Sequence, residues 1–306
     1  MNYLIPEPHE LSYFQREKNV FLDIAACQTI DYTSFFDERL ETLTEIIVDS
    51  YDSTKRNGLI TFKYQKLGPE AYHLVIRDKR VTIKAEDVNG CYYALITLKQ
   101  LAKKYNGLIP LMTIKDKPDM KVRAFQLDIS RSKVPNITTL KKLVDKFATL
   151  KYNHLELYVE GFSYEYNSFR KEIEINNNYL PLADFKELEL YCIENFIDLV
   201  PNQNGFGHMA DWLALDEYKH LAECPEGFYI WGAHRPPSTL DPNNPGSEAL
   251  VKKMYDDMLP NFKSDYFNMD FDEPFELGHG KSKDIVEELG EATVFINFFK
   301  KLSDYV

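Results

Sequence analysis

The chain has 306 residues, of which 44% are hydrophobic and 27% are charged. This balance is typical of a folded globular protein and argues against a disordered or fibrous one, while the length favours two domains. With 48 acidic against 36 basic side chains the formal net charge is −12, which argues against a nucleic-acid or anionic-membrane surface.

The cysteines are far apart and form no CxxC pair: they are Cys27, Cys91, Cys192 and Cys224. We therefore expect neither a disulfide framework nor a zinc site, and no cofactor is indicated. The first 15 residues lack the basic and apolar regions of a secretory signal, and no apolar stretch is long enough to span a membrane. We expect a cytoplasmic protein without membrane contact.

Residues 1–118 are expected to form a small α+β domain. Residues 38–50 suggest a helix. Apolar and polar residues alternate before and after the charged turn at 77–80, which predicts a β-hairpin with one buried face. After residue 90 the apolar period becomes that of an amphipathic helix. Strands and helices in this order predict a sheet with helices on one face.

Residues 119–306 alternate regularly between strands and helices. Strands are expected at 123–129, 154–160, 198–202 and 266–271, with helices near 140–147, 185–196, 250–262 and 284–304. This alternation predicts an α/β fold with a parallel sheet, either doubly wound or a TIM barrel. Gly205-Phe206-Gly207 lacks the rest of a dinucleotide fingerprint. Polar and aromatic residues follow every strand, where barrel active sites lie, and this favours the barrel.

The four βα units expected in residues 119–306 make up half of a (β/α)8 barrel. A complete (β/α)8 TIM barrel has eight strands and about 250 residues, and an open half would leave apolar strand edges uncovered. We therefore expect a partial barrel of about four βα units that forms the N-terminal part of a longer enzyme. The alternative is that two half-barrels pair, which would make self-association a property of the chain.

An acid pair, Asp272-Glu273, follows the fourth expected strand. Adjacent acids occur elsewhere in the sequence, for example at 216–217, and those are expected to be solvated. The position of this pair at the carboxyl end of a barrel strand is what suggests chemistry. Two carboxylates held together in a partly apolar pocket repel each other, so one pKa rises and that acid stays protonated beside an ionised one.

Three segments resemble glycoside hydrolase family 20, the β-N-acetylhexosaminidases. DFDEPFELGHGKS (270–282) is similar to its acid-pair segment, FQLDISRSKVP (125–135) to its first strand, and DLVPNQNGFGHM (198–209) to its third strand and loop. Residues 71–101 resemble its N-terminal non-catalytic domain. The resemblance covers nearly the whole chain in the same order. Phe271 and Asn204 depart from it, since a small residue and an acid are usual at these positions.

The resemblance implies a retaining, substrate-assisted glycosidase, an exception to the two-carboxylate scheme because the substrate's acetamido oxygen is the nucleophile. Glu273 would protonate the glycosidic oxygen and then activate water. Asp272 would orient the acetamido group. Arg131 would bind sugar hydroxyls, and His208 would form hydrogen bonds near the acid pair. The implied partner is a glycan or glycoside that contains N-acetylhexosamine.

Further residues are expected around this site. Asp128 is expected to pair with Arg131, and Glu160 to lie at the rim of the pocket. Trp212 and Trp231 could stack on a sugar face, although a tryptophan packed under a long loop is the commoner case. His208 has no other histidine or cysteine at metal-ligand spacing, so no metal is expected.

Two other functions stay open beside the β-N-acetylhexosaminidase. One is a catalytically incomplete carbohydrate-binding or scaffold half-barrel, which would bind sugar or a partner without hydrolysis. The other is an ordinary two-carboxylate glycosidase, which would be insensitive to a thiazoline mimic of the oxazolinium ion.

Overall fold

The computed structural model describes residues 4–14, 20–31, 37–51, 58–131, 133–176 and 178–306. The chain divides into two compact units. The first unit comprises Met1–Arg123, Leu143–Asn153 and Glu194–Ile197, and the second comprises Ala124–Lys142, His154–Ile193 and Asp198–Val306. Two short segments that follow residue 123 in the sequence, 143–153 and 194–197, therefore belong to the first unit.

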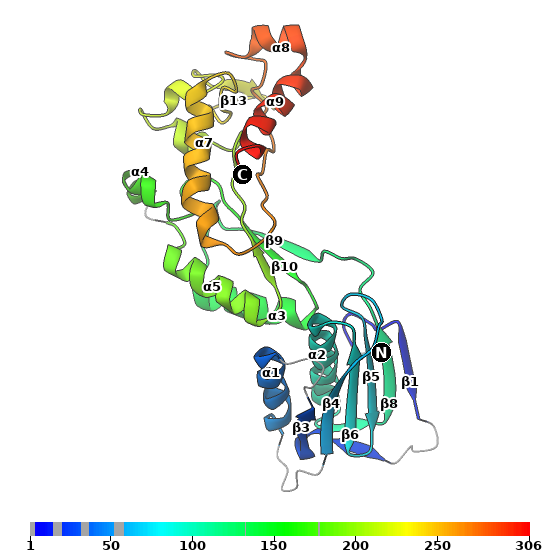
Figure 1. Ribbon diagram of the computed structural model, residues 1–306. Helices are drawn as coiled ribbons and strands as arrows, with labels where there is room; N and C mark the ends of the chain where they lie inside the picture. Colours follow the sequence, from blue (N-terminus) through cyan, green and yellow to red (C-terminus); the bar gives the residue numbers. More distant parts are fainter. Residues whose placement is uncertain (1–3, 15–19, 32–36, 52–57, 132, 177) are drawn as a thin grey trace. The chain divides into compact units, whose positions relative to one another are not determined.

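The first unit is built on a six-stranded mixed sheet with the order β1-β8-β5-β6-β4-β3 (Figure 1). Its strands are β1 (Glu10–Tyr13), β3 (Cys27–Asp31), β4 (Gly58–Tyr64), β5 (Tyr72–Arg77), β6 (Arg80–Ala85) and β8 (Met112–Asp116). The antiparallel pair β5 and β6 is the hairpin that the alternation predicted. β2 (Phe21–Asp23) and β7 (Leu108–Pro110) form a separate antiparallel pair.

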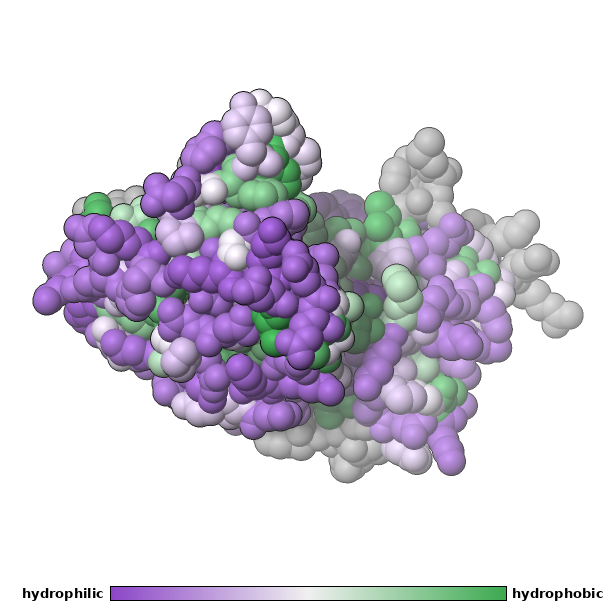
Figure 2. All heavy atoms as spheres, turned by 90° about the horizontal axis from the view of Figure 1, so that it is seen from above, coloured by the Kyte–Doolittle hydropathy of each residue, from purple (hydrophilic) through white to green (hydrophobic). Residues whose placement is uncertain are grey.

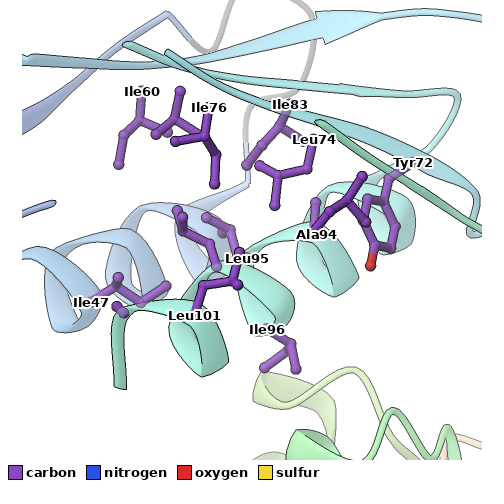
Figure 3. Close-up of a cluster of buried hydrophobic side chains, with 14 of the residues drawn as sticks. Ile47, Ile60, Tyr72, Leu74, Ile76, Ile83, Ala94, Leu95, Ile96 and Leu101 are labelled. Carbon is purple, nitrogen blue, oxygen red and sulfur yellow. The ribbon is translucent and has the colours of Figure 1, made fainter. Parts of the chain in front are cut away.

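Two helices, α1 (Glu38–Asp49) and α2 (Val88–Lys104), lie on one face of this sheet (Figure 1). Each begins after an aspartate, Asp37 or Asp87, whose carboxylate accepts a backbone N–H of the first turn. The core lies between sheet and helices, and Figure 3 shows part of it: Ile47, Ile60, Leu74, Ile76, Ile83, Leu95 and Leu101. The predicted α+β domain with helices on one face is confirmed.

The second unit contains a three-stranded parallel sheet in the order β11-β10-β9. Its strands are β9 (Ala124–Asp128), β10 (His154–Tyr158) and β11 (Asp198–Val200), and the helices that follow the first two in the sequence are α3 (Ile137–Thr149) and α5 (Leu182–Glu194). Parallel pairing places the carboxyl ends of all three strands at one edge. The site residues come directly after these ends.

The remaining elements of the described chain are short helices, a small hairpin and two longer helices. They are η2 (Ile24–Ala26), η3 (Asn167–Phe169), α4 (Arg170–Asn176), α6 (Ala210–Leu213), η4 (Lys219–Leu221), β12 (Phe228–Ile230), β13 (Ala233–Arg235), α7 (Pro245–Met258), η5 (Leu259–Asn261), α8 (Lys283–Leu289) and α9 (Glu291–Ser303). β12 and β13 pair antiparallel as an isolated hairpin.

The fourth strand expected at 266–271 is reduced to a single parallel bridge. Asn268 N donates to Pro201 O at 3.0 Å, and Gln203 N donates to Asn268 O at 3.1 Å. Asp270 then has a φ of +47°, which leaves the extended conformation and ends the pairing. The prediction of a regular strand here is wrong, although the segment still runs beside the third strand's end.

The single helix expected over 284–304 is also wrong, because Gly290 divides it into α8 and α9. Gly290 has a φ of +85°, which an α-helix cannot continue through. The periodicity of the apolar residues correctly predicted helical structure on both sides of Gly290. It did not predict that the helix is interrupted there.

The face seen in Figure 2 is mostly hydrophilic, with scattered hydrophobic side chains between the charged ones. Such a surface is consistent with the strongly acidic composition. Within the described residues, no helix combines the length and the apolar character needed to cross a membrane.

Candidate active site

An arginine held by two carboxylates lies at the carboxyl ends of β9 and β10. Arg131 Nη1 is 2.6 Å from Asp128 Oδ2, and its Nη2 is 3.1 Å from Glu160 Oε2. The guanidinium also lies over the ring of Tyr158, with Cζ 4.8 Å from the ring centroid. The charge-assisted hydrogen bond to Asp128, the ion pair with Glu160 and the stacking on Tyr158 fix the orientation of the planar group. The guanidinium of Arg131 is thereby held in one orientation, while part of the side chain stays exposed to solvent.

Ser130 connects the two loops that carry this arginine and Glu160. Its Oγ accepts from Glu160 N at 2.7 Å and donates to Tyr158 O at 2.9 Å. Its backbone N–H donates to Asp128 Oδ1 at 2.8 Å. No role was expected for Ser130, although it lies between Asp128 and Arg131 in the sequence.

His208 lies between this arginine cluster and the acid pair. Its Nδ1 is 3.5 Å from Glu160 Oε2 and 3.4 Å from Arg131 Nη2. Its Nε2 is 3.3 Å from Asp272 Oδ2 and 3.2 Å from Glu273 Oε2. The hydrogen bond with Glu160 raises the pKa of His208, against the opposing effect of burial, and the charges of Glu160 and Asp272 add to the rise. The charged imidazolium is therefore favoured.

The backbone of the acid pair runs directly against the loop after β11. A Cβ built on Gly207 would lie 2.2 Å from Asp272 O and 2.9 Å from the carbonyl carbon of Glu273. Only glycine allows this approach. In the sequence Gly207 stood out only as part of an incomplete nucleotide fingerprint, so this role was not predicted. The position of Gly207 directly before His208 in the sequence is the feature that could have indicated this role.

Both carboxylates of the pair reach solvent. The side chain of Asp272 is 46% exposed and that of Glu273 is 51% exposed. Glu273 has a φ of +51°, a conformation that is uncommon for residues other than glycine and that clusters at functional sites. The turn gives the two adjacent side chains a common direction, toward His208.

A third acid, Asp270, lies two residues before the pair. Burial raises the pKa of Asp270 to about 7, against the effect of the Asn202 amide, and the negative charge of Asp272 adds to the rise. Its Oδ2 is 3.5 Å from Asn204 Nδ2, and its backbone N–H donates to Asn268 Oδ1 at 3.0 Å. A carboxyl group with a pKa near neutral is thus found at Asp270, beside the pair.

Trp212 does not belong to the site, which corrects the expectation that it binds substrate. Its side chain is 0% exposed, and its Nε1 donates to Gly161 O at 3.1 Å. Aromatic rings surround it, among them Phe162 and Phe169. A tryptophan packed in this way offers no face to a sugar. Trp231, in contrast, is 71% exposed.

His208, Asp272 and Glu273 each offer one donor atom, and these atoms all lie within 4.8 Å of one another. Among the described residues they are the group with the spacing to hold a metal ion. The same imidazole and carboxylates are what acid–base catalysis requires, so the donor set alone does not identify a metal site. The structure thus brings together every expected site residue except Trp212: Asp128, Arg131, Glu160, His208, Asp272 and Glu273.

Family models match nearly the whole chain. Residues 1–117 match glycosyl hydrolase family 20, domain 2, and residues 121–306 match the catalytic domain of the same family. The beta-hexosaminidase subunit beta of Entamoeba histolytica is 24% identical over 254 residues, which cover 77% of this chain and 44% of that protein. A beta-hexosaminidase of Akkermansia muciniphila is 30% identical over 162 residues, or 46% of this chain and 32% of that protein.

Solved structures show the same fold. The exo beta-N-acetylglucosaminidase of Vibrio harveyi in complex with N-acetylglucosamine superposes with a TM-score of 0.81 at 19% identity, covering 99% of this chain and 52% of that one. A beta-N-acetylhexosaminidase of Bacteroides fragilis gives a TM-score of 0.79 at 20% identity, covering 100% of this chain and 64% of that one. The chain thus spans about half the length of these relatives. Because the catalytic-domain model matches residues 121–306, the chain belongs to glycosyl hydrolase family 20.

Proposed function

We propose that the chain hydrolyses terminal β-linked N-acetylhexosamine residues, with retention, by a substrate-assisted mechanism, Glu273 being the general acid/base and Asp272 the acetamido-orienting group. The observation that carries the proposal is the position of His208 Nε2, 3.3 Å and 3.2 Å from the two carboxylates. Because both carboxylates contact the same imidazole nitrogen, they lie close enough together to contact one substrate molecule. Family membership and the names of the relatives support the same chemistry.

In the first step the acetamido carbonyl oxygen of the substrate attacks the anomeric carbon. The bond to the glycosidic oxygen breaks, and Glu273 gives its proton to that oxygen, so the leaving group departs as a neutral alcohol. The positive charge that develops on the oxazolinium ring is stabilised by Asp272, which accepts the acetamido N–H.

In the second step a water molecule attacks the anomeric carbon from the side that the leaving group has left. Glu273 accepts a proton from this water, and the ring opens to restore the acetamido group. Two displacements at one carbon give net retention. Arg131, held by Asp128 and Glu160, is placed to donate to two sugar hydroxyls.

The separation of the acids argues against an inverting enzyme. Inverting pairs are about 6.5–9.5 Å apart to leave room for water, whereas donor oxygens of Asp272 and Glu273 lie within 4.8 Å of each other. A retaining two-carboxylate enzyme is distinguished by a thiazoline inhibitor, which mimics the oxazolinium ring. We expect strong inhibition, and its absence would favour the two-carboxylate mechanism.

The proposal is tested by steady-state hydrolysis of an aryl β-N-acetylglucosaminide. We expect Glu273→Gln to lower kcat by at least about 10²-fold, the usual contribution of a general acid. Glu217→Gln is the matched control, because Glu217 belongs to another acid pair and is exposed at the surface. Equal rates for Glu273→Gln and the control would refute the assignment.

Sugar binding without hydrolysis is the second candidate function. The observations that favour it are the exposure of both carboxylates and the coverage of about half of each relative's length. Among the described strands β9 is the edge strand of the parallel sheet, the position at which a second copy of the chain would add to the sheet. Binding of N-acetylglucosamine by a wild-type chain that releases no aryl alcohol would support this candidate.

A further inference from the structure

The sheet of the first unit has one face that neither α1 nor α2 covers. Both helices pack on the other face, over the buried side chains of the core (Figure 1). Along β5 the buried residues alternate with residues that are exposed or partly exposed: His73, Val75 and Arg77. Successive side chains of a strand point to opposite faces, so this second set lies on the uncovered side. We call this side of β1, β8, β5, β6 and β4 the open face.

A row of basic residues crosses the open face at one level of the strands. Lys63 of β4 lies opposite Lys84 of β6. His73 of β5 follows, with Lys84 opposite it on one side and Lys115 of β8 opposite it on the other. Glu10 of β1 ends the row, with Oε2 2.8 Å from Lys115 Nζ. Neighbouring strands are about 4.8 Å apart, so these side chains are direct neighbours.

Positive charge prevails along this row, although the chain as a whole has a net charge of −12. Burial lowers the pKa of His73, and the charges of Lys115 and Lys84 lower it further, against the opposing charge of Glu10. Like charges at facing positions of neighbouring strands destabilise a sheet. A bound anion would remove this repulsion.

Hydroxyl groups form the next row of the open face, two residues along each strand. Thr61 lies opposite Thr82, with their Oγ1 atoms 3.4 Å apart, and Thr113 belongs to the same row on β8. Beyond this row Arg77 and Arg80 lie opposite each other, and both are exposed. Hydroxyl groups donate and accept hydrogen bonds, and guanidinium groups bind carboxylates in a bidentate manner. The open face thus places neutral hydrogen-bonding groups between two sets of cations.

We propose that the open face binds an acidic polysaccharide, whose charged groups pair with the lysines and arginines and whose hydroxyl groups bond with the threonine row. The spacing of the cations favours this partner over a nucleic acid. Duplex DNA carries one charge per about 1.7 Å, whereas the strands place Lys63 and Lys84 about 4.8 Å apart and the arginines about 13 Å from the basic row. The inference goes beyond the proposed function and does not depend on it.

Calorimetric titration tests the proposal with a ligand that contains no N-acetylhexosamine. The probe is decagalacturonate, which carries one carboxylate on each sugar, and its control is the same oligosaccharide with every carboxylate methyl-esterified. We expect the acidic form to bind and the ester not to bind. The affinity of the acidic form should fall as salt is raised from about 50 mM to about 200 mM, because the cations of the face release counterions.

Two double variants locate the binding surface. Lys63→Gln with Lys84→Gln should weaken decagalacturonate binding about five- to tenfold, the scale of two exposed ion pairs. The matched control is Lys99→Gln with Lys103→Gln, which removes the same charge from exposed positions of α2, on the other side of the sheet. It should bind like the wild type. Equal affinities in the two double variants would overturn the proposal.

The remaining outcomes separate the open face from other partners and from the proposed function. Equal binding of acid and ester, or tighter binding of single-stranded DNA or of phosphatidylserine vesicles, would overturn the proposal. Hydrolysis of an aryl glycoside without decagalacturonate binding refutes the open face alone. Binding that Lys63→Gln with Lys84→Gln weakens, in a chain that hydrolyses nothing, supports the open face and refutes the proposed activity.

Discussion

At the scale of single residues, the site is organised by His208, which lies within 3.5 Å of three carboxylates. Its raised pKa means that the folded state binds the imidazolium proton more tightly than the unfolded state does. The resulting stabilisation is fully present below the ordinary imidazole pKa of about 6.5 and is lost as the pH rises through the raised value.

We therefore expect His208→Gln to lower the melting temperature more at about pH 5.5 than at about pH 9, because the lost interaction involves the imidazolium form. The difference should be about 2–4 °C for each kcal/mol of stability lost. Calorimetry of both proteins measures it. His220→Gln, at an exposed position, should show no such pH dependence, and a pH-independent loss in His208→Gln would contradict the account.

Asp270 adds a pH dependence of the same sign, at a carboxyl group whose ionisation is unfavourable in the folded protein. Its pKa is raised to about 7, so folding binds a proton and stability falls as the pH rises from about 4, the unfolded value, to about 7. Asp270→Asn removes this cost, and its stability relative to the wild type should grow across that range. Carboxyl carbon NMR should show one aspartate that titrates near neutral pH and that vanishes in the variant. A constant stability difference would contradict the shift.

At the scale of elements, the loop after β11 sets the position of the acid pair through Gly207. The Cβ of Gly207→Ala would meet Asp272 O at 2.2 Å, so loop and pair must separate. A displacement of about 1 Å can cost about 10²-fold in rate, and we expect kcat/KM for an aryl glycoside to fall by that order. Gly246→Ala, whose Cβ meets the side chains of Leu221 and Asn244 and no backbone atom within 4 Å among its three nearest contacts, should keep full activity.

Local patterns predicted the elements whose partners are near in sequence. The hairpin of β5 and β6 and the helix α2 were read from alternation and period alone, because each buries one continuous face. The prediction of a strand at 266–271 was wrong because the pairing of this segment depends on residues distant in the sequence and ends at Asp270. The sequence also did not distinguish Trp212 from Trp231, since both lie in the long segment between β11 and α7 and only tertiary packing buries the first.

At the scale of the whole molecule, a buried ion pair joins the 143–153 segment to the sheet of the first unit. Lys151 Nζ lies 2.8 Å from Asp116 Oδ2 and 2.9 Å from Tyr72 Oη. Burial lowers the pKa of Lys151, while Asp116 opposes the shift. Such a pair specifies where a segment docks, because removal of one partner leaves a buried charge.

Lys151→Ala should therefore destabilise the protein by about 3–5 kcal/mol, measured by denaturant unfolding. Lys115→Ala is the control, since Lys115 pairs with Glu10 at the exposed surface of the same sheet and should cost about 0–1 kcal/mol. Similar losses in both variants would show that the buried pair has no special role.

The central claim, that Glu273 protonates the leaving group, is tested most directly by varying that group. The measurement is kcat/KM of wild type and Glu273→Gln with a methylumbelliferyl and with a dinitrophenyl β-N-acetylglucosaminide. The dinitrophenolate needs no proton to depart, so the account predicts a loss of at least about 10²-fold for the first substrate and a much smaller loss for the second. An equal loss on both substrates, or none on either, would contradict it.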